Sequence, residues 1–272
     1  MNEPVLEINN VGKTFQVGDQ QVEVLKGINT RVNKGDFFVI FGPSGSGKST
    51  LLHTLLGLER PTKGEVLSLG KDFYKMSEDE AAEFRKTRIG MVYQQPYWIK
   101  SLTVLENVAF PLFLMGQLPS VALEKAKKML EVVGMEGWSD YMATELSSGQ
   151  QQKIQVARAM INDPVILVAD EPTGNLDSQS GDELMALLQN LNEKEGRTVI
   201  MVTHDLEYLK FGTRIIRVVD GTIADEYSGK DKDRIVEEIV SKRGSQLVKD
   251  LEMKGKLNHR GIKYNGEEAK ND

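Results

Sequence analysis

One nine-residue stretch constrains the fold of this chain more than any other. Residues 42–50 read Gly-Pro-Ser-Gly-Ser-Gly-Lys-Ser-Thr, which fits the pattern Gly-x4-Gly-Lys-Ser/Thr, and they follow an apolar run of strand length at 37–41. Glycines let the backbone turn so that several N–H groups point into one concavity, and a helix beginning near Lys48 adds the positive end of its dipole. The pattern predicts a phosphate cradle between a strand and a helix; the alternative is a glycine-rich turn that binds nothing.

The residue types in this stretch predict how a nucleotide would be held. Lys48 reaches the β and γ phosphates as a mobile charge, and the Ser49 hydroxyl is a ligand of Mg2+. Thr50 supports the start of the helix and is counted with the nucleotide-binding residues. The other loop residues predicted to contact the nucleotide are Gly42, Ser44, Gly45, Ser46 and Gly47.

Composition excludes several classes of protein. A net charge of -6 and a pI near 5.3 argue against a broad basic face that grips nucleic acid. The 272 residues include no cysteine, which excludes disulfides and thiolate chemistry and is compatible with a reducing compartment. The three histidines are too dispersed in sequence to suggest a zinc site. The phosphate loop must therefore attract its anion locally.

The sequence shows no segment that would insert into a membrane. Its start, Met-Asn-Glu-Pro-Val, lacks the charged and apolar regions of a signal peptide, and no apolar run approaches the roughly 20 residues that span a bilayer. We expect a cytoplasmic chain that reaches the cytoplasmic face of the membrane only through a partner.

Hydrophobic patterning predicts an α/β fold with a mostly parallel sheet. Short alternating runs over 5–32 indicate a small N-terminal antiparallel sheet, and strand 37–41 followed by a helix opens the parallel sheet. Helical spacing over 102–114 and 122–133 predicts a helical subdomain of about 95–162 inserted between sheet strands. We assign 1–227 to one nucleotide-binding domain.

The last 45 residues have a different character. Residues 228–272 are densely charged with both signs, and Ile235, Val236, Ile239 and Val240 form one weak amphipathic stretch. We expect a solvated helix there, followed by a frayed tail after about Gly255, and no contribution to nucleotide binding.

Two buried strands end in groups that suit phosphoryl transfer to water. The apolar run 165–169 leads into Asp170 and Glu171, and the run 198–203 leads into His204. Carboxylates at the C-terminal edge of a parallel sheet point into the ligand crevice. Asp170 is placed to hold Mg2+ and Glu171 to polarise a water for in-line attack. Each has a plain alternative, a solvated Asp-Glu turn and a structural histidine, and their joint order is what favours catalysis.

At this point the sequence resembles the ATP-binding subunits of ABC transporters over nearly all of residues 4–227. The segment 166–177, Ile-Leu-Val-Ala-Asp-Glu-Pro-Thr-Gly-Asn-Leu-Asp, is similar to that family's Walker B segment and D-loop, and 146–150, Leu-Ser-Ser-Gly-Gln, to its signature. The resemblance implies a P-loop NTPase core, with Gln94 as the Q-loop glutamine that contacts the metal and His204 as the switch histidine. It also implies that Phe15 stacks on adenine.

The resemblance further implies a head-to-tail homodimer. In the family, Ser147, Gly149 and Gln150 of one subunit close over the nucleotide held by the other. A serine at a helix N-terminus is physically suited to an anion. Ser148 departs from the family pattern, which has a second glycine there. We expect the extra side chain to affect the rate at which the dimer closes or hydrolyses ATP.

Subtype cues look most like the branch that serves lipoprotein release and macrolide export, which also includes the cell-division ATPase FtsE. They lie in 22–27 and 102–112. The resemblance implies a transmembrane permease subunit as partner. Because Tyr97 and Trp98 follow the loop glutamine and aromatics beside a mobile loop commonly anchor interfaces, we expect the surface around 94–101 to dock that subunit; the alternative is that both rings are core of the helical subdomain. Two other functions stay open, a regulatory ATPase of low turnover and a solute-importer subunit.

Overall fold

The structure is a computed structural model that describes residues 3–229 and 232–253. Its strands are β1 (Pro4–Val17), β2 (Gln20–Asn33), β3 (Phe37–Phe41), β4 (Lys63–Ser68), β5 (Lys71–Asp72), β6 (Ile89–Val92), β7 (Ile166–Asp170), β8 (Thr198–Thr203), β9 (Arg214–Val219) and β10 (Thr222–Ser228). Its main helices are α1 (Lys48–Leu55), α2 (Glu78–Arg88), α3 (Val104–Leu114), α4 (Pro119–Val132), α5 (Ser148–Met160), α6 (Ser178–Glu193), α7 (Lys232–Met253) and the 3₁₀ helix η4 (Leu206–Phe211).

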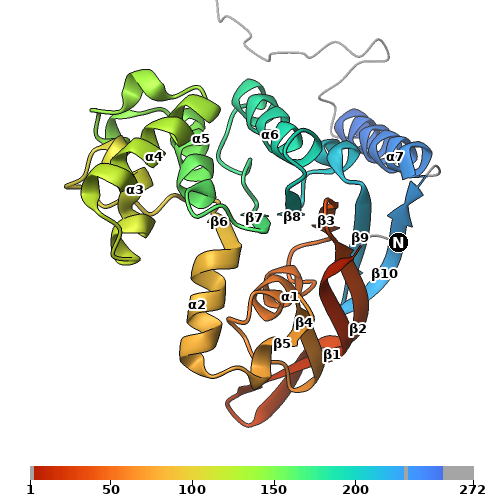
Figure 1. Ribbon diagram of the computed structural model, residues 1–272. Coiled ribbons are helices and arrows are strands. Elements are labelled where there is room, and N and C mark those ends of the chain that lie inside the picture. Colours follow the sequence, from red (N-terminus) through yellow and green to blue (C-terminus); the bar gives the residue numbers. More distant parts are fainter. Residues whose placement is uncertain (1–2, 230–231, 254–272) are drawn as a thin grey trace, which may run out of the picture.

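Two sheets form the frame of the molecule (Figure 1). A six-stranded sheet has the order β10-β9-β3-β8-β7-β6, and a four-stranded antiparallel sheet has the order β2-β1-β4-β5. Strands β9, β3, β8, β7 and β6 pair in parallel, and only β10 is antiparallel. The predicted α/β core with a mostly parallel sheet and an N-terminal antiparallel sheet is confirmed.

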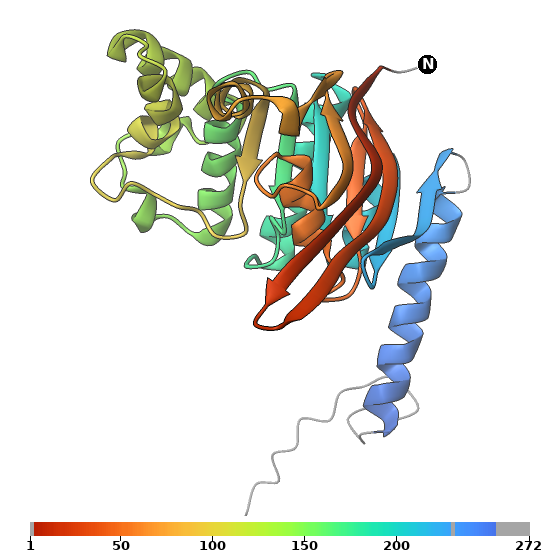
Figure 2. The same ribbon diagram turned by 90° about the horizontal axis from the view of Figure 1, so that it is seen from below.

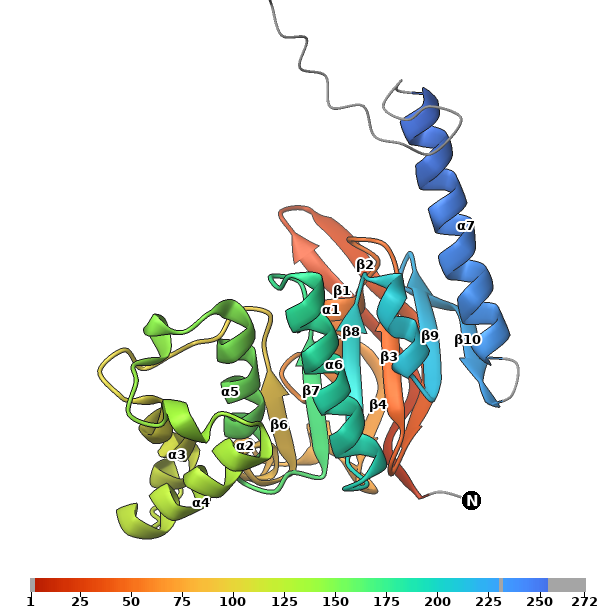
Figure 3. The same cartoon turned by 90° about the horizontal axis from the view of Figure 1, so that it is seen from above.

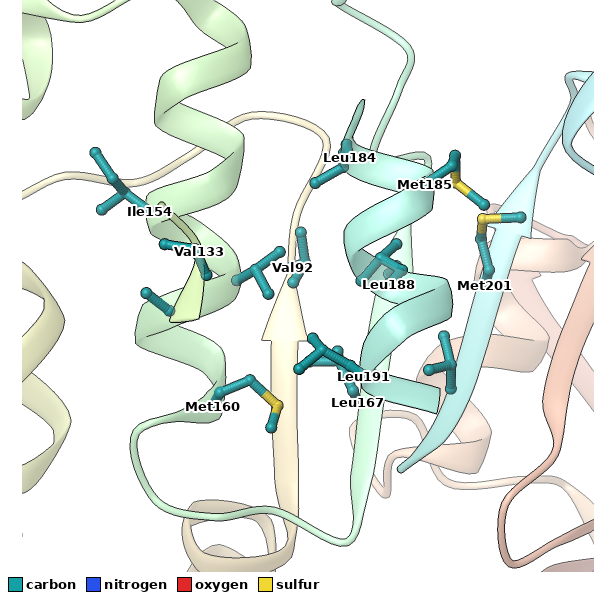
Figure 4. Packing of buried hydrophobic residues seen from close by; sticks show 14 of the residues in the cluster. Val92, Val133, Ile154, Met160, Leu167, Leu184, Met185, Leu188, Leu191 and Met201 are labelled. Atoms are coloured by element: carbon teal, nitrogen blue, oxygen red, sulfur yellow. The ribbon is translucent and has the colours of Figure 1, made fainter. Parts of the chain in front are cut away.

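Alternate side chains of the central strands enter two separate cores, as the two-residue period of a strand requires. Phe38 and Ile40 of β3 face α1 and the N-terminal sheet, whereas Phe37 and Val39 face the side on which α5 and α6 lie. Figure 4 shows the second core, where Met185 of α6 lies against Met201 of β8. Burial on both faces explains why these strands read as continuous apolar runs.

Helices α3, α4 and α5 form a lobe beside the β6 edge of the large sheet (Figure 1). Helix α3 begins with a capping box in which Thr103 and Glu106 satisfy each other's backbone N–H groups. Ala122, Ala126 and Leu130 of α4 are buried at helical spacing. The three helices of the lobe lie between Val104 and Met160, within the stretch 95–162 expected to be helical; the bounds of that subdomain stay a prediction.

Helix α7 lies on the opposite edge of the molecule and is not fully solvated, so this expectation was wrong. Val236 is 4% exposed, and Ile239 and Val240 pack against the same core as α6. Lys232 Nζ donates to the carbonyl of Gly212 at 2.8 Å, directly after η4. Figures 2 and 3 show the helix running past the edge of the domain toward its own C-terminus. The predicted frayed tail after Gly255 lies outside the described residues.

Sequence patterning also missed several elements. The short strands β4 and β5 and the helices α2 and α6 were not predicted, although α6 has Leu184, Leu188 and Leu191 on one buried face. In the parts of the chain that the structure describes, no helix is both long and apolar enough to cross a bilayer.

Candidate nucleotide site

The predicted site residues converge because four neighbouring parallel strands end at one edge. Gly42 follows β3, His204 follows β8 and Asp170 is the last residue of β7. Gln94 comes two residues after β6, the next strand in the sheet. The registers place Phe41 beside Thr203, and Val202 beside Asp170. This edge is the crevice in which open α/β sheets bind ligands.

The phosphate loop is built from backbone that only glycine accommodates. Gly42 has φ 153°, and a Cβ atom there would lie 2.1 Å from the carbonyl oxygen of Val218. Gly47 has φ 101° and forms the N-cap of α1. The close approach of β9 to the loop therefore depends on a residue without a side chain.

Two polar side chains in the loop are buried. Lys48 is 6% exposed, and its Nζ donates to the carbonyls of Gly42 and Pro43, both at 2.9 Å. The buried Ser46 Oγ has no hydrogen-bond partner among the described residues. Buried hydroxyls are normally paired. A phosphate oxygen would supply the missing acceptor, so the loop fits a nucleotide.

A cleft of about 450 Å³ opens above the loop. Its lining residues are Val24, Ser44, Gly45, Gly47, Lys48, Ser49, Thr50, Glu171 and His204. Sequence reasoning did not single out Val24, although the 22/24 alternation on β2 could have shown that it shares a face with Val22. Phe15 lies on β1 opposite Val22 and outside this lining, with Lys13 Nζ 4.7 Å from its ring centroid.

Glu171 and His204 face each other across the cleft. His204 Nδ1 lies 3.3 Å from Glu171 Oε2. Glu171 has φ 46°, a left-handed conformation that is uncommon for a residue with a side chain, and its N–H donates to the Val202 carbonyl at 2.9 Å. Such conformations occur preferentially at functional sites, where the surrounding structure holds them.

Burial shifts the pKa values of the charged groups at the floor of the site. The pKa of Asp170 is raised, mainly by burial and also by the neighbouring Glu171, while His53 and Lys48 act in the opposite direction. Burial lowers the pKa of Lys48, which Glu171 and Asp170 partly offset. His53 lies four residues after Ser49 on α1, a spacing that could have indicated it from the sequence.

The remaining predicted residues lie away from the cleft within one chain. The Gln94 side chain lies near Gly174, where a Cβ atom would be 2.7 Å from its Nε2. Ser147 is exposed at the N-cap of α5, where its Oγ accepts the N–H of Gln150 at 3.3 Å and Gln150 Oε1 accepts the N–H of Ser147 at 3.0 Å. Gly149 and Ser148 begin the same helix.

The donor set near the loop suits a hard cation shared with phosphate. Within 3–229 and 232–253, no group of three or more His, Asp or Glu residues is arranged to hold a metal ion. Ser49 and Asp170 offer hydroxyl and carboxylate oxygens, ligand types that Mg2+ takes together with water and nucleotide phosphates. The amide of Gln94, the third predicted ligand, lies beside Gly174 and outside the lining of the cleft. The residues therefore fit Mg2+ bound along with a nucleotide.

Comparison with known proteins agrees with this site. The family model described as ABC transporter matches residues 25–174, which span the phosphate loop, the Ser147 signature and the Glu171 segment. The chain belongs to the ABC transporter family. It is an ATP-hydrolysing subunit of the ATP-binding cassette type, so the expected family and activity are confirmed.

Relatives match over most of the chain. An uncharacterized ABC transporter ATP-binding protein of Methanocaldococcus jannaschii, MJ1508, is 47% identical over 221 residues, which cover 81% of this chain and 98% of the relative. The macrolide export ATP-binding/permease protein MacB of Chlorobaculum tepidum is 39% identical over 84% of this chain and 35% of its own length. The similarity to MacB therefore covers about a third of that larger protein.

Solved structures share the fold. The dimeric structure of the M. jannaschii cassette MJ0796 in a post-hydrolysis state bound to ADP and Pi has a TM-score of 0.75 and 39% identity, and the match covers 82% of this chain and 98% of that one.

Proposed function

We propose that this chain is the ATPase of an export-type or force-transmitting membrane complex, in which ATP draws two copies together. The observation that carries the proposal is the meeting of Glu171 and His204 above the phosphate loop, 3.3 Å apart at adjacent strand ends. The MJ0796 cassette is dimeric with ADP and Pi, and MacB is a fused ATP-binding/permease protein; both support this assembly.

We assign the roles of the residues from the chemistry of their side chains and, for Phe15 and Gln94, from the family resemblance. Lys48 and the loop N–H groups of 44–50 bind the phosphates, and Phe15 stacks on adenine. Ser49, Asp170 and Gln94 would hold Mg2+, which would supply positive charge to neutralise the phosphates. Glu171 accepts the proton of the attacking water while His204 holds the γ phosphate or that water.

The second half of each site would come from the other copy. Ser147, Gly149 and Gln150 lie at the exposed start of α5, where backbone N–H groups and the helix dipole favour an anion. We propose that these groups close over the γ phosphate bound to the facing chain. The exposed Ser148 is the feature that favours the second candidate, a regulatory ATPase of low turnover.

Steady-state ATP hydrolysis by the purified complex separates these two candidates. Turnover well above that of the isolated chain supports the transport or force-transmitting function. A rate that stays near zero while ATP binds supports the regulatory one. A solute-importer subunit would instead need an extracytoplasmic binding protein for its activity.

The docking surface for the permease is proposed to be 94–101, which would place the chain at the cytoplasmic face of the membrane. Tyr97 is 72% exposed, whereas Trp98 packs against the core of the helical lobe and donates to Gln151 Oε1 at 2.8 Å. Tyr97→Ala should therefore weaken co-purification with the partner and leave ATP binding intact. Trp98→Ala is expected to destabilise the lobe as well, so it is the less selective variant.

A further inference from the structure

A pair of buried amides on α5 holds the backbone of the loop that follows β6. Gln155 Oε1 accepts the N–H of Tyr93 at 2.7 Å, and its Nε2 donates to the Tyr93 carbonyl at 2.9 Å. Gln152 Nε2 donates to the carbonyls of Tyr93 and Gln94 at 3.1 and 3.0 Å. The two amides are joined by a bond from Gln155 Nε2 to Gln152 Oε1 at 2.6 Å.

Two more α5 side chains hold the far end of the same loop. Arg158 Nη1 donates to the Tyr97 carbonyl at 2.7 Å, and its guanidinium lies 4.5 Å from the Trp98 ring centroid. Gln151 accepts the indole N–H of Trp98. The loop is therefore bound to α5 at both ends, at residues 93–94 and 97–98.

The contacts of this loop with the sheet side are weaker. Asn175 Nδ2 reaches the Gln94 carbonyl at 3.4 Å, and the Gln94 amide lies against Gly174. Gln152 and Gln155 are almost fully buried, at positions where an α5 residue facing the core would ordinarily be apolar. A buried amide persists when its hydrogen bonds fix one arrangement, and here all of them except the bond between the two amides go to the backbone of Tyr93 and Gln94.

We propose that Gln152 and Gln155 are positioning residues that make the Gln94 loop move with α5 and its Ser147 end instead of with the sheet. Docking at 94–101 would then displace the signature end and the Gln94 side chain together. The inference rests on the proposed function in that Gln94 acts at the nucleotide.

Distances between introduced labels test this directly, because the chain has no native cysteine to interfere. Spin labels at Tyr97→Cys and Lys128→Cys on α4 report the loop against the helical lobe. Replacing Gln152 and Gln155 by Met keeps their volume and removes the hydrogen bonds. We expect the distance distribution to become at least about twice as wide; an unchanged width overturns the proposal. Gln189→Met on α6 is the matched control, and it should leave the width as in the parent.

The kinetic constants for ATP hydrolysis distinguish a positioning role of Gln152 and Gln155 from a purely structural one. In the unlabelled double Met variant we expect kcat to fall about tenfold or more while the KM for ATP stays within about twofold, because misplacement of a positioned group affects the reacting geometry. An equal loss in kcat and ATP affinity contradicts the positioning role. A near-zero rate of ATP hydrolysis by the complex that contains the parent chain would instead contradict the proposed function. If the double variant does not fold, Gln152→Met serves alone, since Gln155 still pairs with Tyr93.

Discussion

The phosphate loop and the Ser147 end of α5 are both helix N-termini suited to an anion, but they are built in opposite ways. The phosphate loop is made of backbone and a buried lysine, and its serine Oγ at 46 lacks a partner within the described chain. The Ser147 end is exposed, and its capping bonds to Gln150 are already satisfied. The first is an incomplete pocket that a ligand would finish, whereas the second is a finished helix start that presents its dipole to solvent.

This difference teaches that ATP affinity and ATP-dependent association should be separable. Groups in the phosphate loop contact the nucleotide that is bound by their own chain. In the proposed assembly, groups at the Ser147 end act on a nucleotide brought by another copy, and they are not among the residues that line the cleft of their own chain. The following variants test whether ATP affinity and ATP-dependent association can be separated, beginning with the largest expected effect.

Glu171→Gln should produce the largest change. The amide keeps the shape of the side chain but cannot accept a proton, so hydrolysis should fall by about 10² to 10⁴-fold while ATP binding is preserved. Gel filtration with ATP and Mg2+ should show a dimer that is absent with ADP, because nucleotide at about 100 times its dissociation constant contributes roughly 2.7 kcal/mol per site. The exposed Glu195→Gln is the control. A monomer in both nucleotides would contradict the shared site.

Lys48→Ala should weaken ATP binding by the single chain. Hydrogen bonds to charged groups contribute about 1.5–3 kcal/mol, which corresponds to a loss of roughly ten- to a hundredfold in affinity. Isothermal titration of the chain with ATP measures it, and Lys63→Ala, an exposed lysine of β4, should bind like the parent. Unchanged affinity would mean that backbone alone holds the phosphates.

Ser147→Ala should affect association and not affinity. In the Glu171→Gln background we expect ATP-dependent dimerisation to weaken by about tenfold, the size of one lost hydrogen bond. ATP affinity measured at concentrations below those at which the chain dimerises should match the parent. Since an N-cap serine also stabilises its helix by about 1 kcal/mol, Ser77→Ala at the N-cap of α2 controls for that loss.

Asp170→Asn should give a small rise in Tm for the nucleotide-free chain at neutral pH. Burial and Glu171 raise the pKa of Asp170 in the folded chain, so its ionised form opposes folding above the ordinary carboxyl pKa. The increase in folding stability from Asp170→Asn is therefore present at neutral pH. It disappears as the pH falls below the ordinary carboxyl pKa. Thermal melts at several pH values, without Mg2+, measure it. An unchanged or lower Tm at neutral pH would show that the carboxylate is stabilised by its neighbours.

Truncation after Tyr227 should have the smallest effect on the site. All proposed phosphate contacts lie upstream, so ATP affinity should stay within about twofold of that of the full chain. The Tm should fall, because Val236 and the Lys232 bonds on η4 are lost. A loss of ATP binding by a folded truncated chain would place the domain boundary elsewhere.

Short sequence motifs were enough to predict the functional residues at the strand ends. They were much less informative about contacts between segments that are distant in the sequence. The phosphate loop, Asp170, Glu171 and His204 are read from short motifs next to apolar strands, and the fold gathers them by the direction of a parallel sheet. Gln152 and Gln155 could not be assigned this way, because their partners are backbone groups about 60 residues upstream. The burial of Val236 was misjudged although its amphipathic stretch was visible, because the many charged residues around that stretch were taken as a sign of solvation.

The placement of β3 determines when the site can exist during synthesis of the chain. Strand β3 lies between β8 and β9, which are made more than 150 residues later. The carbonyl of Ser46 accepts the N–H of Gly221, so the turn between β9 and β10 holds the loop from behind. The ribosome therefore makes the phosphate loop early, but the loop acquires its final surroundings only after nearly the whole domain has emerged. Until then ATP cannot assist folding, and the early segments depend on their own contacts or on chaperones.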